Sequence, residues 1–186
     1  MTADYFASLK SCLDGLQIQQ PRLQQALKVL YQAYRKGKTV FIIGNGGSSA
    51  TASHFACDLT KTTRKDGELA LRAVCLSDNV SLLTAYSNDI DYESAFRELL
   101  RTYAMVGGVL ICFSVSGDSA NILAAARYAV DLGLATIAFT GIDGGKLAPL
   151  VELAIKVPSR DYGQVEDMHL ILAHYITAEL KKMLGD

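Results

Sequence analysis

The sequence has no apolar stretch long enough to cross a lipid bilayer, and no basic segment followed by an apolar run at its start. It also has no excess charge of either sign, because 18 Lys and Arg residues stand against 19 Asp and Glu residues, mixed along the chain. This balance argues against a nucleic acid partner held mainly by electrostatic attraction. We therefore expect a cytoplasmic protein whose partners are neither membranes nor nucleic acids.

Cysteine is scarce, and its spacing excludes the common zinc knuckles. The four cysteines, Cys12, Cys57, Cys75 and Cys112, form no CxxC pattern. Three of them lie in apolar or strand-like surroundings. The sequence therefore predicts four buried thiols and no disulfide.

Apolar residues make up half of the 186 positions, enough for a substantial core, and we expect one domain over residues 1–186. Short apolar runs alternate with segments of helical periodicity. This alternation predicts an α/β fold, a three-layer, doubly wound sheet of five parallel strands with right-handed crossovers. The expected strands cover residues 39–43, 69–76, 109–113, 135–140 and 153–157. One helix is expected to begin after residue 47, and a short helix is expected within residues 77–89. Further helices are expected at 92–103, 120–132 and 164–184, and a polar loop at 61–68.

One more helix is expected before the first strand, from about residue 5 to residue 35, with leucines at helical spacing and an interruption at Pro21. This helix is not part of the alternating units. Because an apolar-faced helix outside the core repeat often packs on another chain, we expect residues 1–36 to pack on partner subunits.

A glycine turn, Gly-Asn-Gly-Gly at residues 44–47, separates the first strand from its helix. Ser48 or Ser49 is expected to cap that helix through its hydroxyl. A strand that turns on glycines into a helix leaves backbone N–H groups and the positive end of the helix dipole at one place, where anions bind. The alternative is a tight connection that binds nothing. His54 and Asp58 are four residues apart, so they share one face of the helix.

A serine-rich loop, SVSGDSAN at residues 114–121, follows the third strand. In a doubly wound sheet, ligands bind beyond the carboxyl ends of the strands, where the strand order reverses. Ser114, Ser116 and Ser119 offer three hydroxyls there, and Gly117 lets the backbone curl towards a ligand. The alternative is that the serines only cap the next helix and satisfy a turn. Three serines exceed what capping needs, which favours phosphate binding.

Four stretches together carry a family resemblance: FIIGNGGSSATASHFACDL at 41–59, SVSGDSAN at 114–121, TGIDGGKLAPLVELAIKVPS at 140–159 and VEDMHLILAHYI at 165–176. They resemble the sugar isomerase (SIS) domain family and, within it, the phosphoheptose isomerase branch, which converts sedoheptulose 7-phosphate into a D-glycero-D-manno-heptose 7-phosphate. The resemblance covers nearly the whole chain. It implies a flavodoxin-like sheet, a homotetramer and active sites built across subunit interfaces.

The resemblance also implies roles for individual residues. Asn45 and Ser48 match sugar-contacting positions in the glycine turn, so Gly46 and Gly47 are expected to contact the substrate as well. Val115 stands where the family usually has Thr, which removes one hydroxyl beside the serines. The implied phosphate ligands are Ser114, Ser116 and Ser119. The implied catalytic pair is Asp58 and His174. The implied zinc ligands are His54, Asp58, Glu166 and His174, and Glu166 is also expected near the substrate.

Two of the four zinc positions depart from the family pattern, since Asp58 stands for Glu and Glu166 for Gln. Both keep oxygen donors, and the extra negative charge should favour a cation. Isomerisation through an enediol needs one group near the carbon and a proton donor near the oxygens. Asp58 can be the base and His174 the acid, or the reverse, and a divalent metal would polarise the carbonyl.

Each candidate has a simpler interpretation. His54 on its own is typical of a core histidine, and Glu166 in the first turn of a helix would be favoured by the dipole whatever its function. His169 is off the face shared by Glu166 and His174, so we expect a structural or supporting role for it. The alternative function is a non-catalytic SIS protein that binds a phosphosugar or a replication initiator. Such a protein has no need of His174.

Overall fold

The computed structural model describes residues 2–64 and 70–185. Within them, one sheet of five parallel strands has the order β2-β1-β3-β4-β5. This is the flavodoxin-like order, in which the direction of strand addition reverses between β1 and β3. The predicted fold class is confirmed. The strands are β1 (Thr39–Gly44), β2 (Arg72–Cys75), β3 (Val109–Ser114), β4 (Ala135–Thr140) and β5 (Leu153–Lys156).

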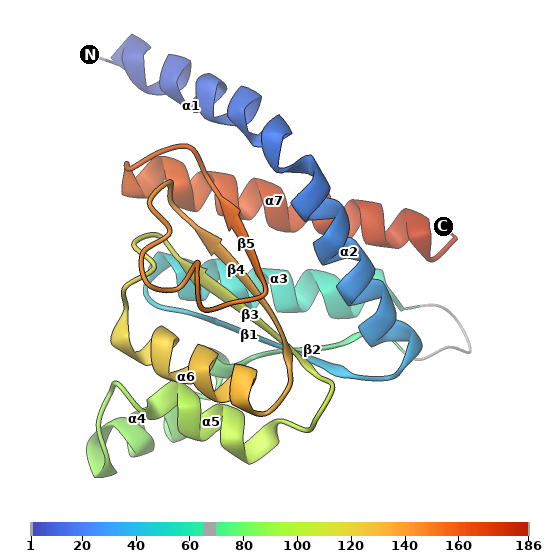
Figure 1. Ribbon diagram of the computed structural model, residues 1–186, viewed down its shortest axis with the longest axis vertical. Helices are drawn as coiled ribbons and strands as arrows, with labels where there is room; N and C mark the ends of the chain where they lie inside the picture. Colours follow the sequence, from blue (N-terminus) through green and yellow to red (C-terminus); the bar gives the residue numbers. More distant parts are fainter. Residues whose placement is uncertain (1, 65–69, 186) are drawn as a thin grey trace.

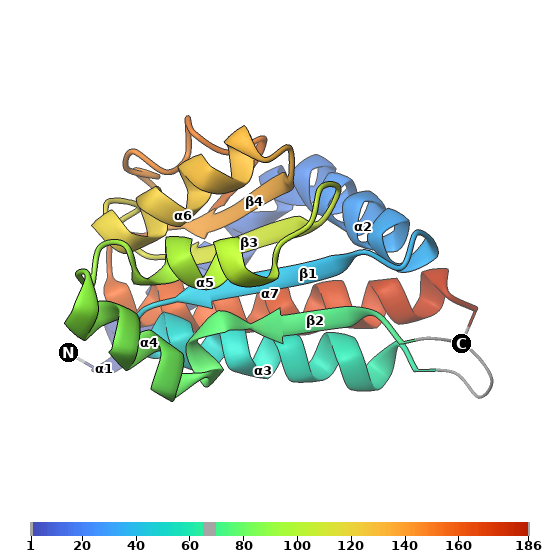
Figure 2. The same cartoon turned by 90° about the horizontal axis from the view of Figure 1, so that it is seen from below.

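Helices cover both faces of the sheet (Figures 1 and 2). One face carries α2 (Gln20–Arg35), α3 (Gly47–Thr62) and α7 (Tyr162–Met183), and the other carries α5 (Ala95–Tyr103) and α6 (Ala120–Asp131). The short α4 (Val80–Asp89) lies beside α5 and buries none of its own residues. The remaining elements are α1 (Thr2–Leu16) and the 3-10 turns η1 (Gln17–Gln19) and η2 (Leu76–Asp78).

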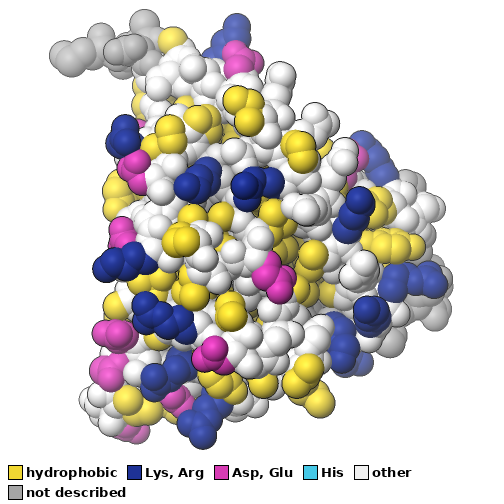
Figure 3. Space-filling model, viewed as in Figure 1, with side chains coloured by type: hydrophobic (Ala, Val, Ile, Leu, Met, Phe, Trp, Pro, Cys, Tyr) yellow, Lys and Arg dark blue, Asp and Glu magenta, His cyan; other side chains and the backbone are white. Residues whose placement is uncertain are grey.

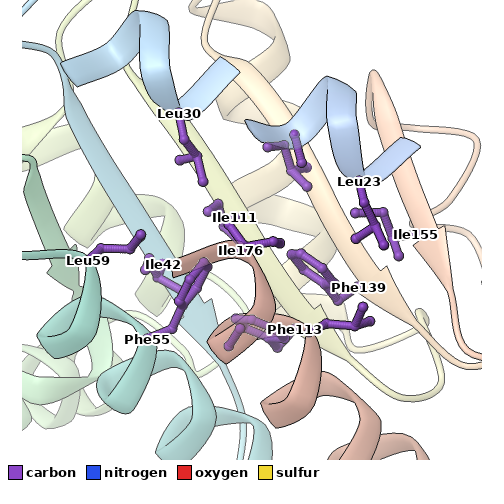
Figure 4. Packing of buried hydrophobic residues seen from close by; sticks show 14 of the residues in the cluster. Leu23, Leu30, Ile42, Phe55, Leu59, Ile111, Phe113, Phe139, Ile155 and Ile176 are labelled. Carbon is purple, nitrogen blue, oxygen red and sulfur yellow. The ribbon is translucent and has the colours of Figure 1, made fainter. Parts of the chain in front are cut away.

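The two cores follow from the period of two along each strand. In β1, Val40 and Ile42 join the core under α2, α3 and α7, whereas Phe41 and Ile43 join the core under α5 and α6. Figure 4 shows the first of these cores, where Phe55 of α3 meets Phe113 of β3. Burying a side chain of this size contributes about 2 to 3 kcal/mol. The packing fixes the positions of the strand ends.

The leading helix is interrupted, as predicted, but the interruption lies at residues 17–19, before Pro21. The 3-10 turn η1 separates α1 from α2, and Pro21 lies in the first turn of α2, where its missing N–H costs nothing. The start of α1 is attached to α7, since Tyr5 Oη donates to Asp167 Oδ2 at 2.8 Å and Ser8 Oγ to Gln164 Oε1 at 3.2 Å.

Three boundaries also differ from the predictions. The helix expected at 92–103 begins at Ala95, and the strand expected at 69–76 covers only 72–75. The helix after the glycine turn continues through Thr62, so the expected loop at 61–68 starts later, and its residues 65–68 lie outside the described residues, as does Leu69.

All four thiols are free, and Cys57 is exposed, which contradicts the prediction of four buried cysteines. Cys57 points outward because it falls on the solvent side of α3, whereas Phe55 and Ala56 are buried. Across residues 2–64 and 70–185, no helix has the length and apolar character needed to span a bilayer.

Candidate active site

Helices α3 and α7 lie side by side on one face of the sheet and both begin at its carboxyl edge (Figures 1 and 2). This parallel arrangement follows from the fold, because each helix after a parallel strand runs back along the sheet. It brings Gly47 beside Glu166 near the helix starts and His54 beside His174 about two turns further on. The predicted site residues therefore form two groups.

The first group surrounds a cavity of about 120 Å³ at the switch point between β1 and β3. We call it the serine cavity. It is lined by Asn45, Ser48, Phe113, Ser114, Val115, Ser116, Ser119, Tyr162 and Glu166. Six of these nine residues were expected from the sequence to contact the substrate.

The serine hydroxyls remain able to donate to a ligand. Ser114 Oγ and Ser116 Oγ accept from the backbone N–H groups of Gly117 and Asp118, both at 3.2 Å, which leaves their O–H groups free to point elsewhere. Ser119 is the N-cap residue of α6, but its side chain makes no capping hydrogen bond. Ser114 and Ser116 therefore satisfy turns, as the alternative expects, whereas helix capping accounts for none of the three serines.

The glycine turn lies on the opposite side of the cavity. Gly46, with a φ of 53°, is the N-cap of α3, and no side chain caps this helix. The prediction that Ser48 or Ser49 caps α3 is wrong, because both residues lie inside its first turn. Ser48 is buried in the cavity wall, whereas Ser49 Oγ donates to Ser77 Oγ at 2.7 Å. The N–H groups of Ser49 and Ala50 donate to the carbonyl of Gly46, so those of Gly47 and Ser48 are the ones left for a ligand.

Glu166 lies in the second turn of α7, not in the first turn as expected. Its carboxylate is packed directly against Gly47, where a Cβ atom would meet Glu166 Oε2 at 2.5 Å. Glycine at position 47 is therefore what lets the carboxylate reach the start of α3. The position is favourable for an anion because it adjoins the positive end of a helix dipole.

The sequence reasoning missed two residues that hold Asn45. Asn121 and Asn45 exchange reciprocal amide hydrogen bonds, both 2.9 Å long, and Tyr92 Oη donates to Asn45 Oδ1 at 2.9 Å. Asn121 closes the SVSGDSAN motif, so its place at the entry of α6 was a usable signal. Tyr92 gave none, because it was assigned to a helix that in fact begins three residues later.

The second group consists of His54, Asp58 and His174, which we call the His–Asp group. His54 Nε2 lies 3.3 Å from His174 Nε2 and 3.4 Å from Asp58 Oδ2, and His174 Nε2 lies 3.7 Å from the same oxygen. The side chains of His54, Asp58 and His174 are 48%, 27% and 52% exposed. No histidine is visible on the side of the molecule drawn in Figure 3, so this group opens on another side.

The spacing of the His–Asp group fits a small divalent ion. Ligand atoms bound tetrahedrally to zinc at about 2.0–2.1 Å are about 3.4 Å apart. The three distances in this group range from 3.3 to 3.7 Å, and three protein ligands leave one coordination position open. Among the described residues, this is the group of His, Cys, Asp and Glu side chains close enough to share an ion, and Glu166 does not belong to it.

His169 lies between the two groups on α7 but takes part in neither. It is fully buried against Phe113 and Phe139, and in the described structure neither ring nitrogen has a geometrically acceptable hydrogen-bond partner. Burial lowers the pKa of its ring to about 4, although the nearby backbone carbonyl of Thr140 acts in the opposite direction. His169 is therefore a neutral residue of the core.

Comparison with known proteins places this chain and its fold in one class. The SIS domain family profile matches residues 4–141, and the chain belongs to the SIS domain family. Phosphoheptose isomerases are among its relatives. That of Mycobacterium tuberculosis (strain ATCC 25177 / H37Ra) is 41% identical over 155 residues, which are 83% of this chain and 79% of the relative. That of Aliarcobacter butzleri (strain RM4018) is 35% identical over 176 residues, 93% of this chain and 91% of the relative.

The solved structures agree with these relatives. The phosphoheptose isomerase of Neisseria gonorrhoeae superposes with a TM-score of 0.90 at 30% identity and covers 97% of both chains. The agreement extends over α1 and α2 as well as the sheet, because so little of either chain is left unmatched. The family resemblance noted in the sequence is confirmed.

Proposed function

We propose that the protein is an aldose–ketose isomerase of heptose biosynthesis that converts sedoheptulose 7-phosphate into D-glycero-D-manno-heptose 7-phosphate. The named relatives support the reaction class. The observation that carries the proposal is the convergence of Asp58 with two imidazoles, 3.4 and 3.7 Å away, on neighbouring helices. A protein that only binds a phosphosugar needs no such group.

The phosphate end of the substrate would occupy the serine cavity. Ser114, Ser116 and Ser119 can donate hydrogen bonds, and the N-termini of α3 and α6 add backbone N–H groups. Asn45, Ser48 and the backbone of Gly46 and Gly47 would then meet the sugar hydroxyls. Neutral donors of this kind hold a phosphate ester without a lysine or arginine clamp.

The His–Asp group would carry out proton transfer. In an enediol mechanism, a base removes the proton from one carbon and an acid supplies one to the neighbouring oxygen. Asp58 and His174 are within reach of each other and can exchange these roles between the forward and reverse reactions. His54 would then orient the Asp58 carboxylate.

Zinc is the metal that we assign to this group. His54, Asp58 and His174 would hold it, since two imidazoles and one carboxylate with an open position are typical of catalytic zinc. When bound, the metal would polarise the substrate carbonyl in place of proton donation by His174, whose Nε2 would then be a ligand, and the second carboxylate oxygen of Asp58 would remain available as the base. Glu166 would act from the serine cavity, not as the fourth ligand expected from the sequence.

A homotetramer with active sites built across subunit interfaces is also part of the proposal, because the resemblance to phosphoheptose isomerases implies it. Along α7, His174 follows Glu166 by eight positions, a rise of about 12 Å. In such an assembly, residues 1–36 would pack on partner subunits. Cytoplasmic localisation remains our prediction.

Incubation of the purified protein with sedoheptulose 7-phosphate, with and without a chelator, tests the proposal. Aldose product that disappears with chelator and returns with added zinc is expected. Binding of the sugar phosphate without any product, in metal-loaded protein, would contradict the enzymatic function and leave only the binding function.

A further inference from the structure

A network of three side chains joins three separate segments at the serine cavity. Asn45 belongs to the glycine turn after β1, Asn121 to the first turn of α6, and Tyr92 to the connection between α4 and α5. Asn45 Nδ2 donates to Asn121 Oδ1, Asn121 Nδ2 donates to Asn45 Oδ1, and Tyr92 Oη donates to Asn45 Oδ1, each at 2.9 Å. Of the three, Asn45 lines the cavity.

A backbone group fixes the direction of the whole network. The N–H of Ile122 can only donate, and it donates to Asn121 Oδ1 at 2.9 Å. The Asn121 amide is therefore held with its oxygen towards Ile122 and its nitrogen towards Asn45 Oδ1. Asn45 must then present its oxygen to Asn121 Nδ2, and Tyr92, which also meets this oxygen, must act as a donor.

The consequence for the cavity is a matter of counting donors and acceptors. Asn45 Oδ1 accepts two hydrogen bonds, which is its full capacity, and Asn45 Nδ2 uses one of its two N–H groups. What Asn45 has left for a ligand is a single N–H donor. The cavity thus presents donors at this position, which suits a phosphate or carbonyl oxygen and disfavours a group that must donate.

We propose that Asn121 and Tyr92 are positioning residues, which hold the Asn45 amide with its free N–H available to the substrate and tie the glycine turn to the serine loop. This inference rests on the proposed function for the identity of the substrate. It does not depend on the chemistry of the His–Asp group. Neither residue needs to touch the substrate, because both act through Asn45.

A purely structural role makes different predictions. Asn121 is 3% exposed and bonded to the start of α6, so its loss would lower stability in any case. Tyr92 is 54% exposed, and removal of its hydroxyl would then change nothing measurable. A positioning role predicts that both changes weaken ligand binding and that they do so through one shared residue.

The test uses Tyr92→Phe, Asn121→Ala and the double variant, with Tyr103→Phe as the matched control. Tyr103 is a comparably exposed tyrosine on the adjacent α5, and its hydroxyl makes no hydrogen bond with any described residue. The readouts are Kd for sedoheptulose 7-phosphate, measured in the presence of a chelator so that no turnover occurs, KM and kcat for the same sugar phosphate, and Tm. Tyr92→Phe should raise Kd and KM about threefold, and Asn121→Ala should raise both about tenfold. In both variants kcat should stay within about twofold of the wild-type value, and in Tyr103→Phe all three quantities should do so.

The double variant is the decisive measurement. If both residues act through Asn45, it should bind no more weakly than Asn121→Ala alone. Multiplied losses in the double variant, or an unchanged Kd in Tyr92→Phe, would overturn the proposal. If the variants show this pattern in Kd yet the wild-type protein does not isomerise sedoheptulose 7-phosphate, the proposed function fails and the positioning role stands.

Discussion

The serine cavity and the His–Asp group are built in opposite ways. The cavity is made of turns at strand ends, its position is fixed by the packed sheet, and three of its polar side chains, those of Asn45, Ser114 and Ser116, already have hydrogen-bond partners. The His–Asp group consists of the ends of three side chains on two helices, each between 27% and 52% exposed. Binding is thus preorganised by the backbone, whereas the reactive group is accessible and has room for an ion or a substrate. Changes in one region should leave the function of the other intact.

His174→Ala should separate binding from chemistry most clearly. Removal of the imidazole takes away a proton-transfer group and one of the three candidate metal ligands, so kcat should fall about a thousandfold or more. Because His174 does not line the serine cavity, the rise in Tm on adding inorganic phosphate should stay within 1 °C of the wild-type rise, a bound set by what a thermal shift resolves. Loss of both turnover and phosphate stabilisation would show that the two regions are not independent.

Gly117→Ala should damage the serine cavity through its backbone. Gly117 has a φ of 71°, and a Cβ atom there would overlap the backbone carbonyl of Gly144. We expect a loss of about 3 kcal/mol in the free energy of unfolding, measured with urea. Gly133→Ala is the matched control, because Gly133 has a φ of 75° and nothing within 4 Å of an added Cβ. It should cost about 1 kcal/mol, and equal losses in the two variants would refute the steric explanation.

His169 should make stability depend on pH without involving either region. Its pKa is lowered by burial from 6.5 in the unfolded chain to about 4 in the folded protein. Between these values the unfolded chain binds a proton that the folded protein does not, so stability falls as the pH falls. The difference between pH 7 and pH 5 is about 2 kcal/mol. In His169→Met, the free energy of unfolding measured with urea should no longer show this difference between pH 7 and pH 5. An unchanged dependence on pH would mean that His169 is not the group responsible.

The sequence was sufficient for the fold because strand and helix periods alternate strongly, and the packed strands β1, β3 and β4 lie within one residue of their predicted ends. Prediction from the sequence was weaker at the edge of the sheet and on the helix surfaces. The edge strand β2 is short and partly exposed, so its apolar run of 69–76 did not mark its true length. Cys57 shows the same limit, since an apolar-looking helix segment does not tell which side faces solvent.

For the site, the residue types could be predicted from the sequence, but their grouping could not. Residues 54 and 58 were placed together by helical spacing alone, and the addition of His174 needed the resemblance to the SIS domain family. The resemblance also assigns Glu166 to this set, yet its carboxylate lies against Gly47. That contact depends on how closely α3 and α7 approach, which no property of α7 alone could predict. The hydrogen bonds of Asn45 with Asn121 and Tyr92 could not be predicted either, because they too depend on how separate segments approach each other.

Glu166→Gln tests the least expected feature of the serine cavity, a carboxylate in the wall of a site for phosphate. The change removes one negative charge while it keeps the shape and one oxygen. Since like charges a few ångströms apart repel, Kd for inorganic phosphate should fall about threefold, and less so at high ionic strength. Glu152→Gln is the control, because Glu152 is exposed at the start of β5, on the opposite edge of the sheet, and should leave Kd unchanged. Weaker phosphate binding in Glu166→Gln would instead mean that the carboxylate attracts a cation or accepts hydrogen bonds from the ligand, and the cavity would then share the chemistry of the His–Asp group.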